Sequence, residues 1–146
     1  MSHLEDIAEF LNTNGWNYTV FLMCYEGPFS LDADLNSAVR RLVGAEVVVE
    51  DLGQVEEAEL LAEVASCLSF VGSDGEGVEP QLVESGEFRS LLIGVLNDAK
   101  HLASRASTIR RLRILEGHPA YPVFWEFAFL STAGSKLSFF IGSSSD

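Results

Sequence analysis

The sequence of 146 residues contains only two cysteines and four prolines, and no apolar stretch approaches the about 20 residues that a membrane-spanning helix requires. Cys24 and Cys67 lie far apart and form no CxxC pair, whereas small secreted scaffolds carry more cysteines. Glu5, Asp6 and Glu9 stand where a signal peptide would carry basic residues. We therefore expect a soluble, cytoplasmic protein that does not bind membranes.

Basic residues are scarce in the first part of the chain. Residues 1–87 hold 18 of the 22 acidic residues and only two bases, Arg40 and Arg41, for a net charge of −16, whereas residues 88–146 have a net charge of +3. Phosphate contacts require a basic footprint, so we expect no nucleic acid among the partners. Two interpretations of the acidity stay open: it solvates helix faces, or it recruits a basic protein partner.

Apolar residues follow helical periodicity over four segments. Hydrophobic residues make up 47% of the chain, which is the composition of one ordinary folded domain, residues 1–146. Spacings of three and four residues predict helices at 2–15, 30–44, 55–71 and 88–109. The second helix is expected to be capped by Ser30 or Asp32 and ended by Gly44. The segment 72–80, which carries several glycines, is predicted to be a loop.

The end of the long fourth helix is open to two interpretations. The helix either breaks and resumes within residues 107–115, or it passes into a strand along the sequence RRLRIL. A strand is suggested because Leu112 and Ile114 alternate with Arg111 and Arg113. Both alternatives end at the glycine and proline that follow this segment.

Aromatic and β-branched residues predict a strand at 16–25, a hairpin at 121–142 and a shorter strand within 45–52. The hairpin turn is expected at STAGSK, and the tail GSSSD is expected to be mobile. One face of the hairpin is predicted to hold Val123, Trp125, Phe127, Phe129, Leu137, Phe139 and Ile141. The fold expected from these elements is α+β, with a small, mainly antiparallel sheet covered on one side by three to four helices.

No pattern in the sequence predicts catalysis, and we assign no catalytic residue, metal ligand or cofactor. The histidines His3, His101 and His118 lack the HxxxH and HExxH spacings of zinc sites. No GxSxG elbow is present, and GSDGEG carries Asp74 and Glu76, which would repel a phosphate. A binding protein is therefore favoured over an enzyme.

Glu126 is unusual because aromatic residues flank it in the sequence VFWEFAF. If its face of the hairpin is covered, desolvation would raise the pKa of this carboxyl group towards that of a general acid or base. An aromatic pocket around Trp16, Trp125, Glu126 and Phe127 would then serve a small-molecule enzyme or ligand binder. The alternative is that Glu126 points to solvent from an exposed sheet face.

Four arginines gather near the middle of the second half, at Arg105, Arg110, Arg111 and Arg113. They either bind an anion or pair with the glutamates of the helix at 55–71. We favour pairing, because an acid in the same molecule is present at high effective concentration.

The leading functional hypothesis is a protein-binding module that engages a basic protein partner. In size and acidity the chain is similar, in general terms, to immunity proteins, secretion chaperones and DNA-mimic inhibitors, a likeness of composition that assigns no residue roles. Complementary charge raises the rate and specificity of association. A homodimer, completed by an exposed aromatic strand, is a third hypothesis. The acidic residues expected to bind the partner are Glu50, Asp51, Glu56, Glu57, Glu59 and Glu63.

Overall fold

The computed structural model describes residues 1–31, 33–44, 46–73 and 75–146, which form five helices and one five-stranded sheet. The strands are β1 (Thr19–Pro28), β2 (Val48–Gln54), β3 (Thr108–Glu116), β4 (Trp125–Ala133) and β5 (Lys136–Ser145). The helices are α1 (Leu4–Asn14), α2 (Leu35–Val43), α3 (Glu57–Leu68), α4 (Pro80–Val83) and α5 (Gly86–Arg105).

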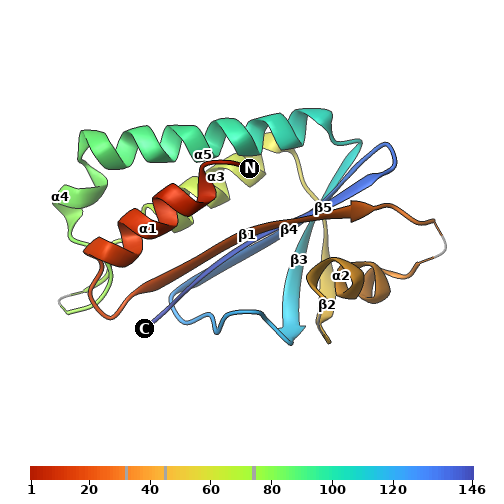
Figure 1. Ribbon diagram of the computed structural model, residues 1–146, viewed down its shortest axis with the longest axis horizontal. Coiled ribbons are helices and arrows are strands. Elements are labelled where there is room, and N and C mark those ends of the chain that lie inside the picture. The colour runs from red at the N-terminus through yellow and green to blue at the C-terminus, as the bar shows by residue number, and fades with distance from the viewer. Residues whose placement is uncertain (32, 45, 74) are drawn as a thin grey trace.

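The sheet is antiparallel throughout, with the strand order β1-β5-β4-β3-β2 (Figure 1). The predicted α+β fold is confirmed, although most element boundaries differ by a few residues from those predicted. None of the described helices is long and apolar enough to cross a membrane.

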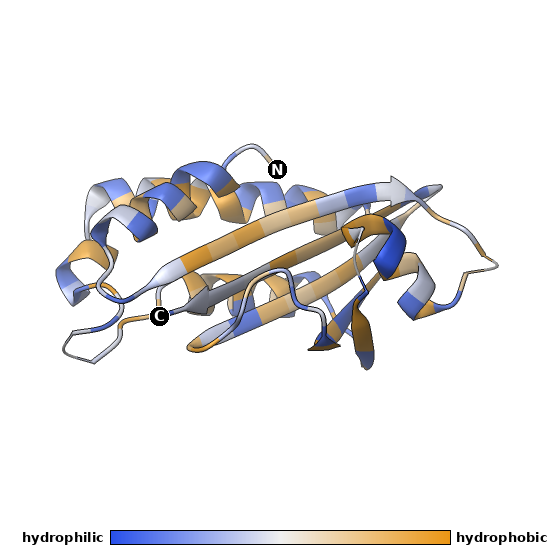
Figure 2. Ribbon diagram, turned by 60° about the horizontal axis from the view of Figure 1, so that its bottom comes forward, coloured by the Kyte–Doolittle hydropathy of each residue, from blue (hydrophilic) through white to orange (hydrophobic). Residues whose placement is uncertain are grey.

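Helices cover both faces of the sheet, not one as predicted. Helices α1, α3 and α5 pack on the face where Phe127, Phe129 and Phe140 are buried. Helix α2 packs on the opposite face, where its Val39 joins a buried cluster that includes Phe139. Figure 2 shows hydrophobic residues along most of the length of the central strands. Because these strands carry apolar side chains on both parities, both faces have to be shielded from water.

Strand β1 begins three residues later than the predicted strand at 16–25. Asn17 adopts a left-handed backbone conformation with φ of 45°, which interrupts an extended chain. Trp16 therefore forms only an isolated bridge to Gly77, with backbone hydrogen bonds of 2.9 and 2.8 Å in the two directions. At its other end β1 extends to Pro28, because β5 continues to pair with it.

Helix α2 starts later than predicted and ends where predicted. Its cap is Asp34, whose carboxylate accepts a hydrogen bond of 2.8 Å from the backbone N–H of Ser37. Asp32 lies outside the described residues, and Ser30 precedes the helix. Gly44 ends the helix in the left-handed conformation with φ of 74°, as a C-terminal glycine commonly does. Strand β2 occupies part of the predicted 45–52 region, of which residue 45 is not described.

The segment 107–115 is a strand, so the second of the two sequence interpretations is correct. Helix α5 ends at Arg105. The backbone of Ala106 is extended, and the N–H of Ser107 then donates to the carbonyl of Thr132 at 2.7 Å. From Thr108 onward β3 lies between β2 and β4. Pairing with neighbours on both sides outweighs the helical preference of the preceding residues.

The C-terminal hairpin is confirmed, but its register differs from the prediction of a shared apolar face. Ala133 pairs with Lys136, so the turn has two residues and Gly134 takes a left-handed φ of 60°. Phe129 therefore faces Phe140, and Phe139 lies on the opposite face of the sheet together with Leu137 and Ile141. The prediction assumed a longer turn, and a change of one residue reverses the faces of a strand.

The prediction that the tail GSSSD is mobile is wrong, because most of its residues belong to β5. Ser143 and Ser144 are 1% and 0% exposed, because β5 lies between β1 and β4. Gly142 leaves room for neighbouring side chains: a Cβ atom there would lie 2.5 Å from the Phe127 ring and 2.8 Å from Leu22. A small residue is thus required at this position of β5, because large side chains from the two neighbouring strands, β1 and β4, extend over it.

Candidate functional site

Strands β3 and β4 pair over only part of their length and then separate. Their ladder joins Thr108–Arg111 to Phe129–Thr132. If it continued in the same register, Leu112 would pair with Ala128. Beyond this point, among the residues that the structure describes, β3 pairs only with β2, and β4 pairs only with β5. The sheet therefore divides within its plane, and Figure 1 shows β3 diverging from β4.

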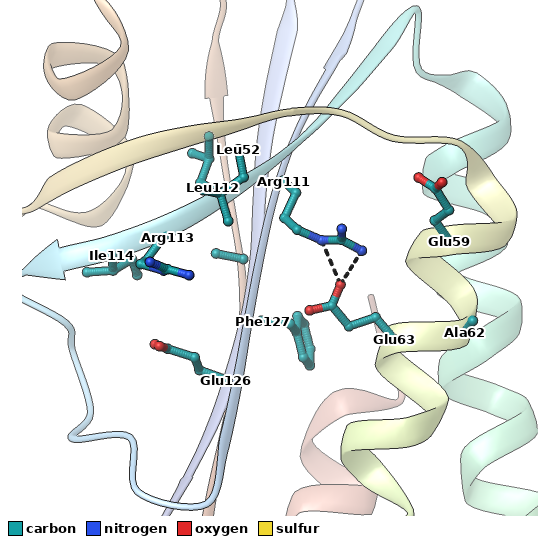
Figure 3. Close-up of a pocket in the computed structure, with 11 residues that line it drawn as sticks. Leu52, Glu59, Ala62, Glu63, Arg111, Leu112, Arg113, Ile114, Glu126 and Phe127 are labelled. Carbon is teal, nitrogen blue, oxygen red and sulfur yellow. Dashed lines mark hydrogen bonds and ion pairs between the residues drawn. The ribbon is translucent and has the colours of Figure 1, made fainter.

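A cleft of about 670 Å³ occupies this division of the sheet (Figure 3). Helix α3 closes it on one side, and the two separated strands form its walls. We call this site the β3–β4 cleft, and its lining residues are Leu52, Glu59, Ala62, Glu63, Arg111, Leu112, Arg113, Ile114, Glu126, Phe127 and Ala128.

The connection between β3 and β4 is held by contacts at both of its ends. A Cβ atom at Gly117 would lie 2.2 Å from the carbonyl oxygen of Glu46, so the chain after β3 packs closely against the segment before β2. At the other end of the connection, the N–H groups of Val123 and Phe124 donate to the carbonyl of Ser144 at 2.7 and 3.2 Å. The two ends are thus fixed to opposite sides of the cleft.

Arg111 joins helix α3 to the sheet at the closed end of the cleft. Its Nη2 and Nε atoms donate to the same Glu63 carboxylate oxygen at 2.7 and 2.9 Å. The guanidinium group also lies over the Phe129 ring, 5.8 Å from its centre. The predicted pairing of the arginines with the glutamate-rich helix is confirmed for Arg111.

Arg113 and Glu126 place opposite charges on the two walls of the cleft. Arg113 comes from β3 and Glu126 from β4, and neither forms an ion pair with any residue that the structure describes. The Glu126 side chain is exposed, so the covered, desolvated carboxyl group considered from the sequence is not present. The cleft therefore presents a hydrogen-bond donor group on one wall and an acceptor group on the other.

Several of the acidic residues expected to bind a partner are engaged within the protein. The carboxylate of Asp51 accepts a hydrogen bond of 2.7 Å from Arg110, which together with the N–H of Gly53 lowers the pKa of Asp51. The side chains of Glu56 and Glu59 form a reciprocal capping box at the start of α3. These carboxylates are partly committed to holding the fold.

Of the six predicted acids, Glu59 and Glu63 line the β3–β4 cleft. Glu50 is exposed and pairs across the β2–β3 ladder with Arg113. Glu57 is half-buried in the first turn of α3. The predicted acids thus lie on β2, on α3 and at its N-terminal cap, and two of them line the cleft.

The four residues of the predicted aromatic pocket do not form one site. Trp16 is 67% exposed and contacts the segment around Gly77, away from the cleft. Trp125 packs in the helix-covered cluster, where its Nε1 donates to the Tyr18 hydroxyl at 2.7 Å and its ring stacks on Phe127. Only Phe127 and Glu126 line the cleft.

The sequence analysis names Arg111 and Arg113 as candidates for anion binding or ion pairing, but it does not identify Leu112 and Ile114, the apolar cleft residues of β3. Their alternation in RRLRIL indicates a strand and nothing more. Leu112 and Ile114 face the cleft because β4 is not there to pair with them, and this cannot be seen from the pattern of one strand.

Other groups that could carry chemistry are not assembled into a site. Among the described residues there is no cluster of histidine, cysteine and acidic side chains that could hold a metal ion. Burial raises the pKa of Cys24 and of Cys67 to about 11, so both thiols are protonated at neutral pH and react slowly. Burial also lowers the pKa of His118, whose Nδ1 accepts a hydrogen bond from the N–H of Ala120.

Comparisons with known proteins assign no family to this chain. No protein-family model matches the sequence, no curated protein matches it, and no solved structure matches the fold. The β3–β4 cleft is therefore the basis on which a function can be argued.

Proposed function

We propose that the protein is a protein-binding module that accepts an extended segment of a basic protein partner in the β3–β4 cleft. The observation that carries this proposal is the division of the sheet, which leaves the facing edges of β3 and β4 without strand partners. Unpaired strand edges are templates for another extended chain.

The segment would enter at the open end of the cleft, beside Ile114 and Glu126, and would stop at the Arg111–Glu63 pair. Pairing with either wall would satisfy backbone N–H and C=O groups that otherwise face the cleft. Because side chains of an extended chain alternate, one set would point towards α3 and the other towards the face that carries α2. The cleft can therefore select a sequence as well as a conformation.

The charge of the protein supports a basic partner. The chain has a net charge of −13, and the predicted acids Glu50, Glu59 and Glu63 lie on β2 and α3 around the cleft. Such a field raises the rate at which a basic protein meets the site. Glu126, which has no ion-pair partner among the described residues, would accept a hydrogen bond from a lysine or arginine of the bound segment.

The test uses Ala62→Trp, which would fill the cleft from α3, and Ala62→Ser as its matched control, which changes the same position without filling the cleft. Basic proteins captured by the wild type at low salt and released at high salt would be identified and purified for affinity measurements. We expect Ala62→Trp to weaken binding at least about tenfold, which corresponds to about 1.4 kcal/mol. Ala62→Ser should stay within about twofold of the wild type. Equal affinity of the two variants would contradict binding in the cleft.

A small-molecule ligand is the second candidate, favoured by the volume of the cleft. About 670 Å³ lies within the roughly 300–1,000 Å³ of ligand pockets. Arg113 and Glu126 would then orient the ligand from opposite walls. A screen of metabolites by thermal shift separates the two candidates: a ligand that stabilises the wild type but not Glu126→Gln would support the small-molecule candidate.

A further inference from the structure

The two edges of the sheet differ in how well they are protected from pairing with another chain. Strand β2 has two register shifts, at Val48/Val49 and at Asp51/Gly53, and it carries acidic residues. Bulges and charges are the usual protection of an edge strand. Strand β1 pairs with β5 over ten residues without a shift, and it carries one charged residue, Glu26. Figure 2 shows β1 as hydrophobic along most of its length.

Asn12 of α1 occupies the free edge of β1 at one residue. Its amide nitrogen donates to the carbonyl of Val20 at 3.2 Å, and its amide oxygen accepts from the N–H of Val20 at 2.6 Å. Both backbone groups of Val20 therefore point away from β5. At the other end, the N–H of Phe29 donates to Ser135 at 2.8 Å, in line with odd-numbered residues facing β5.

The same alternation fixes which backbone groups of β1 lie at the free edge. Because the residues of a strand point their N–H and C=O groups alternately to either side, Leu22, Cys24 and Glu26 point away from β5, as Val20 does. Within the described residues, no side chain and no turn or loop backbone donates to or accepts from these groups. The three outward-facing residues Leu22, Cys24 and Glu26 thus have backbone N–H and C=O groups that no described group binds.

We propose that a second copy of this chain pairs antiparallel with β1, around a two-fold axis at Cys24, to form a continuous ten-stranded sheet. This inference does not depend on the proposed function, because the β3–β4 cleft lies on the other side of β5 and β4. Leu22 would pair with Glu26 of the second copy, and Cys24 would pair with its own equivalent. Three such pairs exchange two hydrogen bonds each, about six in total.

This register is favoured because the strand is complementary to itself. Pairing around Cys24 places Val20, whose backbone groups are bound to Asn12, opposite Pro28 of the second copy, which has no N–H to donate. Pairing around Met23 would instead place the blocked Val20 opposite the open Glu26. Pairing around Tyr25 would place the open Leu22 opposite Pro28. Only the register around Cys24 matches the three open residues with one another.

The side chains of β1 are compatible with this pairing. Met23, which is 41% exposed, would lie opposite Tyr25 of the second copy. Cross-strand contacts of this kind stabilise a sheet. Glu26 would lie opposite Leu22, and its carboxylate is already paired with Lys136 at 3.0 Å. No two like charges would therefore meet along the shared ladder.

Oxidation tests the proposed axis. The Cα atoms of two cysteines in a hydrogen-bonded antiparallel pair lie about 5.5 Å apart, within the roughly 4.4–6.8 Å of a disulfide. Prolonged oxidation of Cys67→Ser at alkaline pH, which raises the thiolate fraction of the slowly reacting Cys24, is expected to yield a disulfide-linked dimer on a non-reducing gel. The matched control Cys24→Ser, which retains Cys67 of α3, should yield none. A dimer of equal yield from both variants would overturn the proposed axis.

Light scattering tests the backbone pairing independently of the thiol. Wild type and Cys24→Ser are expected to have twice the mass of one chain at high protein concentration. Cys24→Pro removes the N–H that points out of the edge, a change that edge strands tolerate, and it should weaken the dimer at least about tenfold. Circular dichroism checks that this variant is folded. The mass of one chain for the wild type, or equal dimerisation of the serine and proline variants, would overturn the proposal.

Discussion

Strand β4 pairs with β5 on one side and with β3 on the other, and these two junctions, which we call seams, differ in how far the strands stay paired. Between β4 and β5 the ladder runs without a shift from Trp125↔Ser144 to Ala133↔Lys136. Between β4 and β3 it stops after Arg111↔Phe129 and opens into the β3–β4 cleft. Residue type does not explain the difference, because β3 also carries β-branched and large apolar residues.

The difference in pairing follows from the segments that connect the strands. A two-residue turn joins β4 to β5 and fixes their register directly. The connection from β3 to β4 is longer, and its two ends are fixed near Glu46 and at Ser144, on opposite sides of the opening. An open site within a sheet therefore depends on how the strands are joined more than on which residues they contain.

The largest expected loss of stability comes from a substitution beside the continuously paired β4–β5 seam. Phe139 is fully buried beside the β4–β5 seam, so Phe139→Ala should reduce the free energy of unfolding by about 3–5 kcal/mol. Ile114→Ala, at the half-buried wall of the cleft, should cost about 1 kcal/mol. Urea denaturation measures both. Similar costs would mean that the cleft is packed as tightly as the closed seam.

The connection is tested by Gly117→Ala. The substitution places a Cβ atom against the carbonyl of Glu46 at a φ of 76°, and we expect a loss of about 2–4 kcal/mol from strain and overpacking. Gly134→Ala is the matched control, since it also has a positive φ but no heavy atom within 4 Å of the added Cβ, and it should cost about 1–2 kcal/mol.

Hydrogen exchange shows whether Gly117→Ala acts on the cleft. The variant should increase exchange in residues 112–116 of β3 while leaving β5 unchanged. Equal losses of stability in the two glycine variants, with no local change in β3, would show that the connection does not hold the cleft open.

The ion pair at the closed end of the cleft is expected to contribute less. Glu63 and Arg111 are 28% and 36% exposed, so solvent screens their attraction. A double-mutant cycle with Glu63→Gln and Arg111→Met should give a coupling free energy of about 0.5–1 kcal/mol. The control cycle pairs Glu63→Gln with Arg113→Met, and a coupling of similar size there would contradict a specific role for Arg111.

The smallest expected effect is on the pH dependence of stability, through the ion pair between Asp51 of β2 and Arg110 of β3. The hydrogen bond from Arg110 lowers the pKa of Asp51 in the folded protein, so this carboxylate stabilises the fold above its unfolded-state pKa. That contribution is lost as the pH falls through the folded-state pKa. The difference in stability between wild type and Asp51→Asn should therefore shrink in acid. In an Arg110→Met background the same difference should be smaller at neutral pH, and an unchanged pH profile would contradict the assignment.

The candidate site shows how far the sequence alone can lead. Glu59, Glu63 and Glu126 were selected from the sequence, and the structure places all three in one cleft. Their meeting could not be predicted, because it requires α3 to pack across the opening between two strands that are distant in the sequence. The aromatic pattern also predicts that Trp16 shares a pocket with Glu126, but Asn17 directs Trp16 elsewhere through a local backbone conformation.

The sequence by itself determined the α+β class, four of the five described helices, the C-terminal hairpin and the concentration of acidic residues, whereas α4 was not predicted. These features follow from local periodicity, turn residues and composition, which each segment carries on its own. Only the tertiary structure decided that helices cover both faces, that β5 is the strand beside β1, and that β3 separates from β4. Those outcomes depend on the exact length of the connections and on contacts between distant segments. A shift of one residue in the register of a strand is enough to reverse the faces on which its side chains lie.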